Sequence, residues 1–160
     1  MEPIEAPNKY VLCYQLGVKE NLLKFARQLG IEKGLHLIII PTNEYTCAQP
    51  ESVRSLSPEH FLYLVKNASY VVTDSFHGTI FSINFGVQFF SFSKVVGSLE
   101  TFDNIRIVEI LESFNIQERF IEGKESQDLP ANIDYASLNK ELQKRRESSQ
   151  IIINRIVETA

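Results

Sequence analysis

The sequence predicts an α/β fold, a doubly wound parallel sheet of four or five strands with helices on both faces. Short apolar runs bounded by turn residues, such as YVVT at 70–73, are typical of strands buried in a parallel sheet. Segments with apolar residues at helical spacing lie between these runs, so strand and helix alternate along the chain. With 160 residues, of which 44% are hydrophobic, the chain is long enough to bury the core of one such domain.

The beginning of the chain predicts a strand, a helix and a second strand. We expect strands over 10–16 and 35–40, and a helix over 20–29 that ends at Gly30. This spacing is that of a right-handed βαβ unit. A loop over 42–56 follows, and its length indicates that it is either mobile or functional.

The stretch YVVTDSFHGTIFSINFGVQFFSF at 70–92 predicts a strand, a polar turn and a helix. The strand ends at Thr73 and Asp74, the residues around Gly78 turn the chain, and TIFSINF forms a helix that stops at Gly86. In an open α/β sheet such a turn lies at the carboxyl ends of the strands, where ligands bind, and the first amides of the helix favour an anion. The sequence therefore predicts a pocket for a negatively charged group.

The other segments of the second half are assigned by the same criteria. Ser57 caps a helix with Pro58 in its first turn, and this helix leads into the strand at 70–73. The later segments are an irregular stretch over 93–104, a helix over 105–114, an ambiguous segment over 116–121 and a polar loop over 122–132.

The two ends of the chain have compositions of their own. Residues 1–9 carry two prolines, as linkers do, and residues 134–157 predict one long helix. That helix contains the consecutive Ile151, Ile152 and Ile153. One helix cannot bury all three against its own domain, so we expect part of this end to be exposed or covered by a second copy of the chain in a homodimer.

Net charge and cysteine usage narrow the classes of partner. A formal net charge of −4 argues against nucleic acid or an anionic membrane surface as the main partner, although a local cluster of cations can still hold an anionic small ligand. The two cysteines, Cys13 and Cys47, form no disulfide framework and lack metal-ligand spacing. No apolar run reaches a membrane span of about 18 residues and the start has no signal-peptide core, so we expect a cytoplasmic protein.

His77 is the strongest single candidate for a catalytic or ligand-binding residue. It is either a structural hydrogen-bonding residue or a functional one, because histidine titrates near neutral pH and can hold a phosphate or pass a proton. Ser75 and Thr79 have hydroxyls that bind phosphate oxygens or cap the helix. Asp74 either orients His77 or caps the turn, and Gly78 either lets the backbone approach a ligand or serves only the turn.

Basic residues further along the chain are candidates for the same ligand. Arg106, at the start of a predicted helix, either clamps a carboxylate or phosphate in bidentate fashion or lies on the surface beside Asp103. Lys94 is a weaker candidate of the same kind. His36 in a buried strand and His60 in the first turn of a helix are interpreted as structural. The sequence has no metal constellation, Walker loop, dinucleotide fingerprint or nucleophile elbow.

Three segments carry a family resemblance: SPEHFLYLVKNASYVVTDSFHGTIFSINFGVQFFSF at 57–92, IRIVEILESFNIQERFI at 105–121 and NIDYASLNKELQKRRESS at 132–149. With TDSFHGTIFSI as its core, the chain from about residue 10 to about residue 150 resembles the C-terminal half of bacterial polysaccharide pyruvyl transferase family proteins. This resemblance implies a two-domain fold like that of the GT-B glycosyltransferases, with the active site in the cleft between two Rossmann-like halves.

The same resemblance implies a chemistry. Family members take phosphoenolpyruvate as donor, with no further cofactor, and form a pyruvate ketal on a sugar of a cell-surface polysaccharide. We therefore expect a sugar or a lipid-linked oligosaccharide as acceptor. The expected location is the cytoplasm, including the inner face of the membrane.

Residue by residue, the resemblance makes His77 the catalytic or donor-phosphate histidine and Arg106 a candidate donor clamp. The implied substrate-binding residues are Asp74, Ser75, Gly78, Thr79 and Arg106. Some branches of the family carry an arginine two residues before the histidine, where this chain has Ser75. One donor-binding cation is therefore missing or comes from elsewhere.

The N-terminal half of the family is absent from this sequence. We expect residues 1–9 to be a linker and residues 10–160 to be the C-terminal, Rossmann-like domain of a longer protein, inactive alone. Two alternatives remain open. One is the donor domain of a GT-B nucleotide-sugar glycosyltransferase, which Ser75 in place of arginine suits no worse, and the other is a non-catalytic interaction domain.

Overall fold

The computed structural model describes residues 6–54, 56–96, 99–100, 102–122 and 129–158. The chain divides into two compact units, Met1–Pro130 and Ala131–Ala160. The first unit contains the sheet and the candidate site, and the second contains a single long helix.

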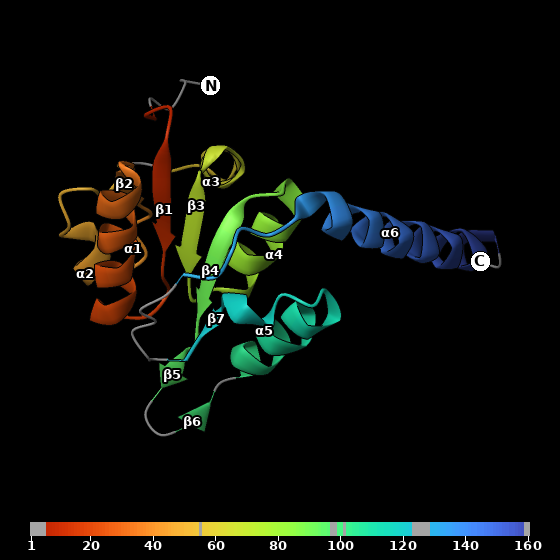
Figure 1. Ribbon diagram of the computed structural model, residues 1–160. Helices are drawn as coiled ribbons and strands as arrows, with labels where there is room; N and C mark the ends of the chain where they lie inside the picture. Colours follow the sequence, from red (N-terminus) through yellow and green to blue (C-terminus); the bar gives the residue numbers. More distant parts are fainter. Residues whose placement is uncertain (1–5, 55, 97–98, 101, 123–128, 159–160) are drawn as a thin grey trace. The chain divides into compact units, whose positions relative to one another are not determined.

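The first unit is built on a five-stranded, all-parallel sheet with the order β2-β1-β3-β4-β7 (Figure 1). Its strands are β1 (Tyr10–Tyr14), β2 (His36–Ile39), β3 (Tyr70–Thr73), β4 (Gln88–Phe92) and β7 (Phe120–Ile121). A separate antiparallel pair is formed by β5 (Val95–Val96) and β6 (Leu99–Glu100). The predicted α/β class and the predicted parallel sheet are confirmed, and the architecture is Rossmann-like.

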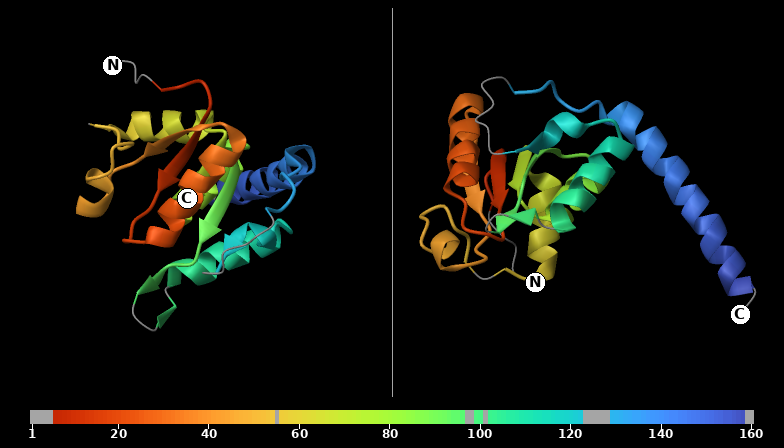
Figure 2. Two further views of the ribbon diagram at one scale, coloured as in Figure 1. Left: turned by 60° about the vertical axis from the view of Figure 1, so that its left-hand side comes forward. Right: turned by 90° about the horizontal axis from the view of Figure 1, so that it is seen from below.

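Helices cover both faces of this sheet. One face carries α1 (Glu20–Lys33), and the other carries α3 (Pro58–Asn67), α4 (Phe76–Phe85) and α5 (Phe102–Ser113), as the right-hand view of Figure 2 shows. The short helix α2 (Glu44–Cys47) follows β2, and the 3-10 turn η1 (Gln117–Arg119) precedes β7. Cover on both faces is the reason why the strands read as continuous apolar runs.

The core alternates between the two faces along each strand. Val11 and Cys13 of β1 pack with Leu22 and Ala26 of α1 in one buried cluster, whereas the intervening Leu12 is buried on the opposite face. Burial raises the pKa of the Cys13 thiol to about 12, so this cysteine behaves as a core residue.

Helix α1 ends later than predicted. The predicted end was Gly30, but the helix continues to Lys33, and Gly34 adopts the left-handed conformation with φ of 63°. Gly30 lies inside the helix, where an added Cβ would be 3.1 Å from the carbonyl oxygen of Leu35. The prediction was wrong because glycine has more than one use. Gly30 packs closely against the backbone at Leu35 inside the helix, whereas Gly34 takes the left-handed conformation that ends it.

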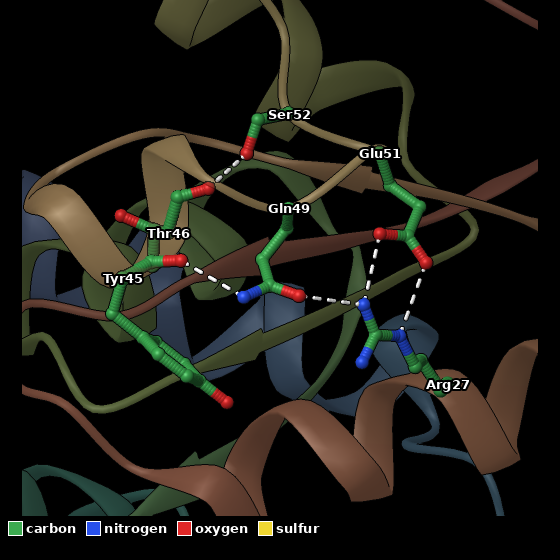
Figure 3. Close-up of polar contacts among 6 residues, drawn as sticks. All are labelled: Arg27, Tyr45, Thr46, Gln49, Glu51 and Ser52. Atoms are coloured by element: carbon green, nitrogen blue, oxygen red, sulfur yellow. Dashed lines mark hydrogen bonds and ion pairs between the residues drawn. The ribbon is translucent and has the colours of Figure 1, made fainter.

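The segment predicted as a mobile or functional loop over 42–56 is held by hydrogen bonds in its described part. Arg27 of α1 donates from Nε and Nη2 to the two carboxylate oxygens of Glu51 at 3.0 and 2.9 Å, and from Nη2 to Gln49 Oε1 at 2.9 Å (Figure 3). This bidentate contact lowers the pKa of Glu51. Val53 N donates to Ile39 O at 3.1 Å, so the segment also lies along β2.

Other predicted boundaries differ by a few residues. β1 and β2 are shorter than expected, and α5 begins at Phe102 rather than at 105. The stretch over 93–104 is not wholly irregular, because it contains β5, β6 and the first turn of α5. The ambiguous segment over 116–121 forms η1 and β7. Within the predicted loop over 122–132, residues 123–128 lie outside the described residues.

The two histidines interpreted as structural have different surroundings. His60 completes a capping box at the start of α3, where Ser57 N donates to His60 Nδ1 at 3.4 Å and Ser57 Oγ accepts from His60 N at 3.3 Å. His36 is exposed, so the prediction that it lies in a buried strand was wrong. Its strand β2 is at the edge of the sheet, and His36 is its first residue.

The second unit contains the predicted long helix as α6 (Tyr135–Glu158). Asp134 accepts hydrogen bonds from Ser137 Oγ at 2.7 Å and from Ala136 N at 3.0 Å, which lower the pKa of its carboxyl group. Ile151, Ile152 and Ile153 are 54%, 58% and 51% exposed, in agreement with the prediction that part of this end is exposed. Among the described helices, none combines the length and the apolar character that crossing a membrane requires.

Candidate functional site at the carboxyl edge of the sheet

All five strands run in one direction, so their carboxyl ends share one edge of the sheet, toward which the arrows in Figure 1 point. From β1 the chain passes outward to β2 on one side, and β3, β4 and β7 follow on the other. The winding therefore reverses between β1 and β3. In doubly wound sheets the crevice outside this reversal is where ligands bind.

Asp74 joins the two loops that border this crevice. Its fully buried carboxylate accepts from Leu16 N at 2.6 Å and from Gly17 N at 3.2 Å, both in the loop after β1. The two alternatives expected for Asp74 were to orient His77 or to cap the turn. These hydrogen bonds show a third role, which is to fix the loop after β1 against the end of β3.

Helix α4 begins at Phe76, earlier than the predicted Thr79, and Gly78 lies inside its first turn rather than in a turn before it. Ser75 is the N-cap, and its Oγ accepts from Gly78 N at 3.4 Å. A Cβ on residue 78 would lie 2.6 Å from Thr73 Oγ1. The expectation that Gly78 turns the chain was therefore wrong, because the glycine is needed where α4 approaches β3.

Thr79 and Ser75 use their hydroxyls inside the domain. Thr79 Oγ1 donates to Ser75 O at 3.1 Å and is hydrogen-bonded to Ser91 Oγ at 2.6 Å. Both Thr79 and Ser75 are buried. Of the two roles expected for each hydroxyl, the structure shows the capping role for Ser75 and an internal contact for Thr79.

His77 and Arg106 each contact the ring of Phe76, the first residue of α4. His77 is exposed, and its ring lies edge-on to Phe76 with the centroids 6.0 Å apart. Arg106 Cζ lies 3.7 Å from the centroid of the same Phe76 ring. Arg106 is in the second turn of α5 rather than at its start. The predicted arginine and the predicted histidine thus contact the same aromatic ring.

Two residues that the sequence did not single out shape the neighbouring loops. Asn104 is buried, and its side-chain amide pairs with the backbone of Lys94, with Lys94 N to Oδ1 at 2.6 Å and Nδ2 to Lys94 O at 2.9 Å. Lys19 is the half-buried residue before α1. Burial is the main cause that lowers the pKa of its amino group; the charge of Lys94 lowers this pKa further, and the charge of Asp74 opposes the shift. The signal for Lys19 in the sequence is its place between a strand and a helix, immediately before the first residue of α1.

Gln15, directly after β1, is a further residue that the sequence did not indicate. Its side chain is fully buried, and neither Oε1 nor Nε2 has a hydrogen-bond partner within the described part of the chain. A buried amide without partners costs stability, so Gln15 marks a weak point of the core at this edge.

A cavity of about 550 Å³ lies elsewhere, lined by Pro41, Cys47, Ala48, Gln49, Pro50, Ser52, Val53 and Arg54. None of the predicted site residues lines it. The described residues contain no group of three or more His, Cys, Asp or Glu side chains that could hold a metal ion.

The sheet order and the polar residues at its carboxyl edge define a Rossmann-like domain with a candidate ligand site at the point where the winding reverses. The family model of polysaccharide pyruvyl transferase matches residues 4–93, more than half of the chain, and the chain belongs to this family. The matched segment includes Asp74, Ser75 and His77 and ends before Lys94 and Arg106. Comparisons with curated proteins and with solved structures gave no match.

Proposed function

We propose that this chain is the C-terminal, donor-binding domain of a GT-B-like pyruvyl transferase that moves pyruvate from phosphoenolpyruvate to a sugar as a ketal. Membership of a transferase family supports this assignment. The observation that carries it is that Arg106 and His77 both contact Phe76 at the start of α4. A cationic side chain and an imidazole at a helix N-terminus suit a phosphorylated donor.

The proposed reaction begins with protonation of the methylene carbon of the enol phosphate. One sugar hydroxyl attacks the cationic carbon that results and loses its proton. Inorganic phosphate then leaves with the electrons of its C–O bond, and a second hydroxyl closes the ketal and releases another proton. His77 acts as the general acid or as the partner of the phosphate, a role worth about 10²- to 10⁴-fold in rate.

The rest of the edge supplies positive charge for the donor. Arg106 has the planar fork that binds a carboxylate or a phosphate in bidentate fashion, and the N-terminus of α4 adds the favourable end of the helix dipole. Lys19 and Lys94, which lie within electrostatic reach of each other, are our candidates for the cation that an arginine at position 75 would supply. The buried residues of this edge, which are Asp74, Ser75, Gly78 and Thr79, hold the loops and the start of α4 in place by internal contacts.

The proposal extends to the partners of the domain. An N-terminal half would supply the acceptor side of the cleft, so the isolated domain is inactive. The acceptor is a sugar or a lipid-linked oligosaccharide, met in the cytoplasm or at the inner face of the membrane. No metal, further cofactor or nucleic acid takes part. The exposed isoleucines of α6 are the candidate surface for a homodimer.

One observation favours a second candidate function. Ser75 stands where some family branches carry an arginine, and it caps α4. A helix start capped by serine also suits the diphosphate of a nucleotide sugar, so the donor domain of a GT-B glycosyltransferase is the alternative.

The deciding experiment measures ketal formation from phosphoenolpyruvate by the enzyme that includes its N-terminal half. We expect His77→Ala to lower the rate by about 10²- to 10⁴-fold, whereas His36→Ala, which changes the exposed histidine of β2, leaves it unchanged. An unchanged rate of ketal formation in His77→Ala would refute the role assigned to His77. A nucleotide sugar that raises the melting temperature of this chain more than phosphoenolpyruvate does would favour the glycosyltransferase, and no shift with either would favour a non-catalytic domain.

A further inference from the structure

We propose that Phe76 is a positioning residue that holds the guanidinium of Arg106 at the start of α4, so that Arg106 and His77 bind one anionic donor. This inference rests on the proposed function and extends it to Phe76, to which neither the sequence nor the proposed function gives a role. Its basis is the 3.7 Å separation between Arg106 Cζ and the centroid of the Phe76 ring.

The contact is close for its kind. A cation within about 6 Å of a ring centroid is attracted by the ring, and 3.7 Å is van der Waals contact. Arg106 is exposed, whereas Phe76 is half-buried. An exposed arginine has several rotatable bonds and loses entropy when it binds a ligand, so a ring that restricts it beforehand lowers that cost.

Both partners of the contact are anchored by their own elements. Phe76 follows the N-cap Ser75 and precedes His77, so its ring and the imidazole start from adjacent residues of one helix turn. Arg106 lies two residues after Asn104, whose amide is bonded to the backbone of Lys94. The contact therefore joins the second turn of α5 to the first residue of α4.

The chemistry of the contact suits a ligand site. An aromatic ring engages the face of a guanidinium rather than its N–H edge. A phosphate or a carboxylate requires the N–H edge for a bidentate contact. Phe76 thus orients Arg106 without competing for the donors that an anion would use.

The experiment combines binding of phosphoenolpyruvate to this chain, measured by calorimetry, with the NMR signals of the Arg106 side chain. We expect Phe76→Leu to weaken binding about two- to fivefold, the size of an exposed cation–π contact, and Phe76→Tyr to restore it. In the Arg106→Ala background, Phe76→Leu should have no further effect, because the two residues act through one contact. Phe81→Leu, on the same helix but with its ring against Phe61 and Phe85, is the matched control.

The NMR signals report the geometry without a ligand. A guanidinium above a ring is shielded, so the Arg106 Hδ and Hε signals should lie upfield in the wild type and in Phe76→Tyr but not in Phe76→Leu. Unshielded signals in the wild type, or an equal loss of affinity from Phe76→Leu with and without Arg106, would overturn the inference while leaving the proposed function intact. Failure of phosphoenolpyruvate to bind the wild type would overturn the proposed function and the role of Phe76 with it.

Discussion

Gly78→Ala tests the close approach of α4 to β3 at the carboxyl edge of the sheet. The added Cβ would lie 2.6 Å from Thr73 Oγ1 and 3.1 Å from Thr73 Cβ and Cγ2. A separation of 2.6 Å is too short for a carbon and an oxygen that are not bonded, so Thr73 must rotate or the helix must move. Thr73 Oγ1 donates to Tyr14 O at 2.6 Å and accepts from Ser75 N at 3.0 Å, so rotation breaks both hydrogen bonds.

The magnitude follows from two opposing effects. Two lost hydrogen bonds cost about 1–3 kcal/mol in total, and the alternative of a moved helix costs about as much through overpacking. Alanine is the better helix former by up to about 1 kcal/mol. The net expectation is a loss of about 1–2 kcal/mol in the free energy of unfolding. The sign is informative, because helix propensity alone predicts a gain.

The assay is urea unfolding of four proteins: wild type, Gly78→Ala, Thr73→Ala and the double variant. Thr73→Ala removes Oγ1 and Cγ2, so in that background Gly78→Ala should cost at least about 1 kcal/mol less. If Gly78→Ala is as stable as the wild type, or if its cost is the same in both backgrounds, the close approach is not what requires the glycine.

Two further predictions concern stability. Gln15→Leu should raise the free energy of unfolding by about 1 kcal/mol, because it replaces a buried amide without partners by an apolar side chain; a lower urea midpoint would show that the amide is satisfied. Arg27 lowers the pKa of Glu51 below its ordinary 4.5, so the stability that Glu51 contributes is present above that pH and is lost as the pH falls through the lowered value. Between pH 3 and pH 7, the difference in the free energy of unfolding between wild type and Glu51→Gln should therefore become smaller as the pH falls. A difference that stays constant over this range would contradict the prediction.

Local signals in the sequence were sufficient for many elements. Ser57 with Pro58 indicated the start of α3, and Gly86 indicated the end of α4, because caps depend on residues that are adjacent in the chain. The apolar runs indicated the strands of the sheet, and their alternation with helices indicated a parallel arrangement. The same local reasoning placed His77 in the turn between the strand and the helix, whereas the structure has it in the first turn of α4.

The packing around individual glycines decided what the local signals left open. The sequence predicted Gly30 as the end of α1, whereas the structure has Gly30 packed near Leu35 O inside the helix and the cap at Gly34. Gly78 suggested a turn, whereas it lies in the first turn of α4. The glycine is needed there because the helix comes close to Thr73. Glycine has several uses, and only the surrounding atoms distinguish them.

The sequence by itself determined the α/β class, the family and the position of His77 after β3, because periodicity, caps and a short motif are properties of neighbouring residues. Only the tertiary structure decided that Asp74 binds the loop after β1 and that Arg106 lies on Phe76. Both contacts join segments that are far apart in the chain and meet only where the parallel strands end together. The geometry of the candidate site is therefore a property of the sheet, and the chemistry of its residues is a property of the motif.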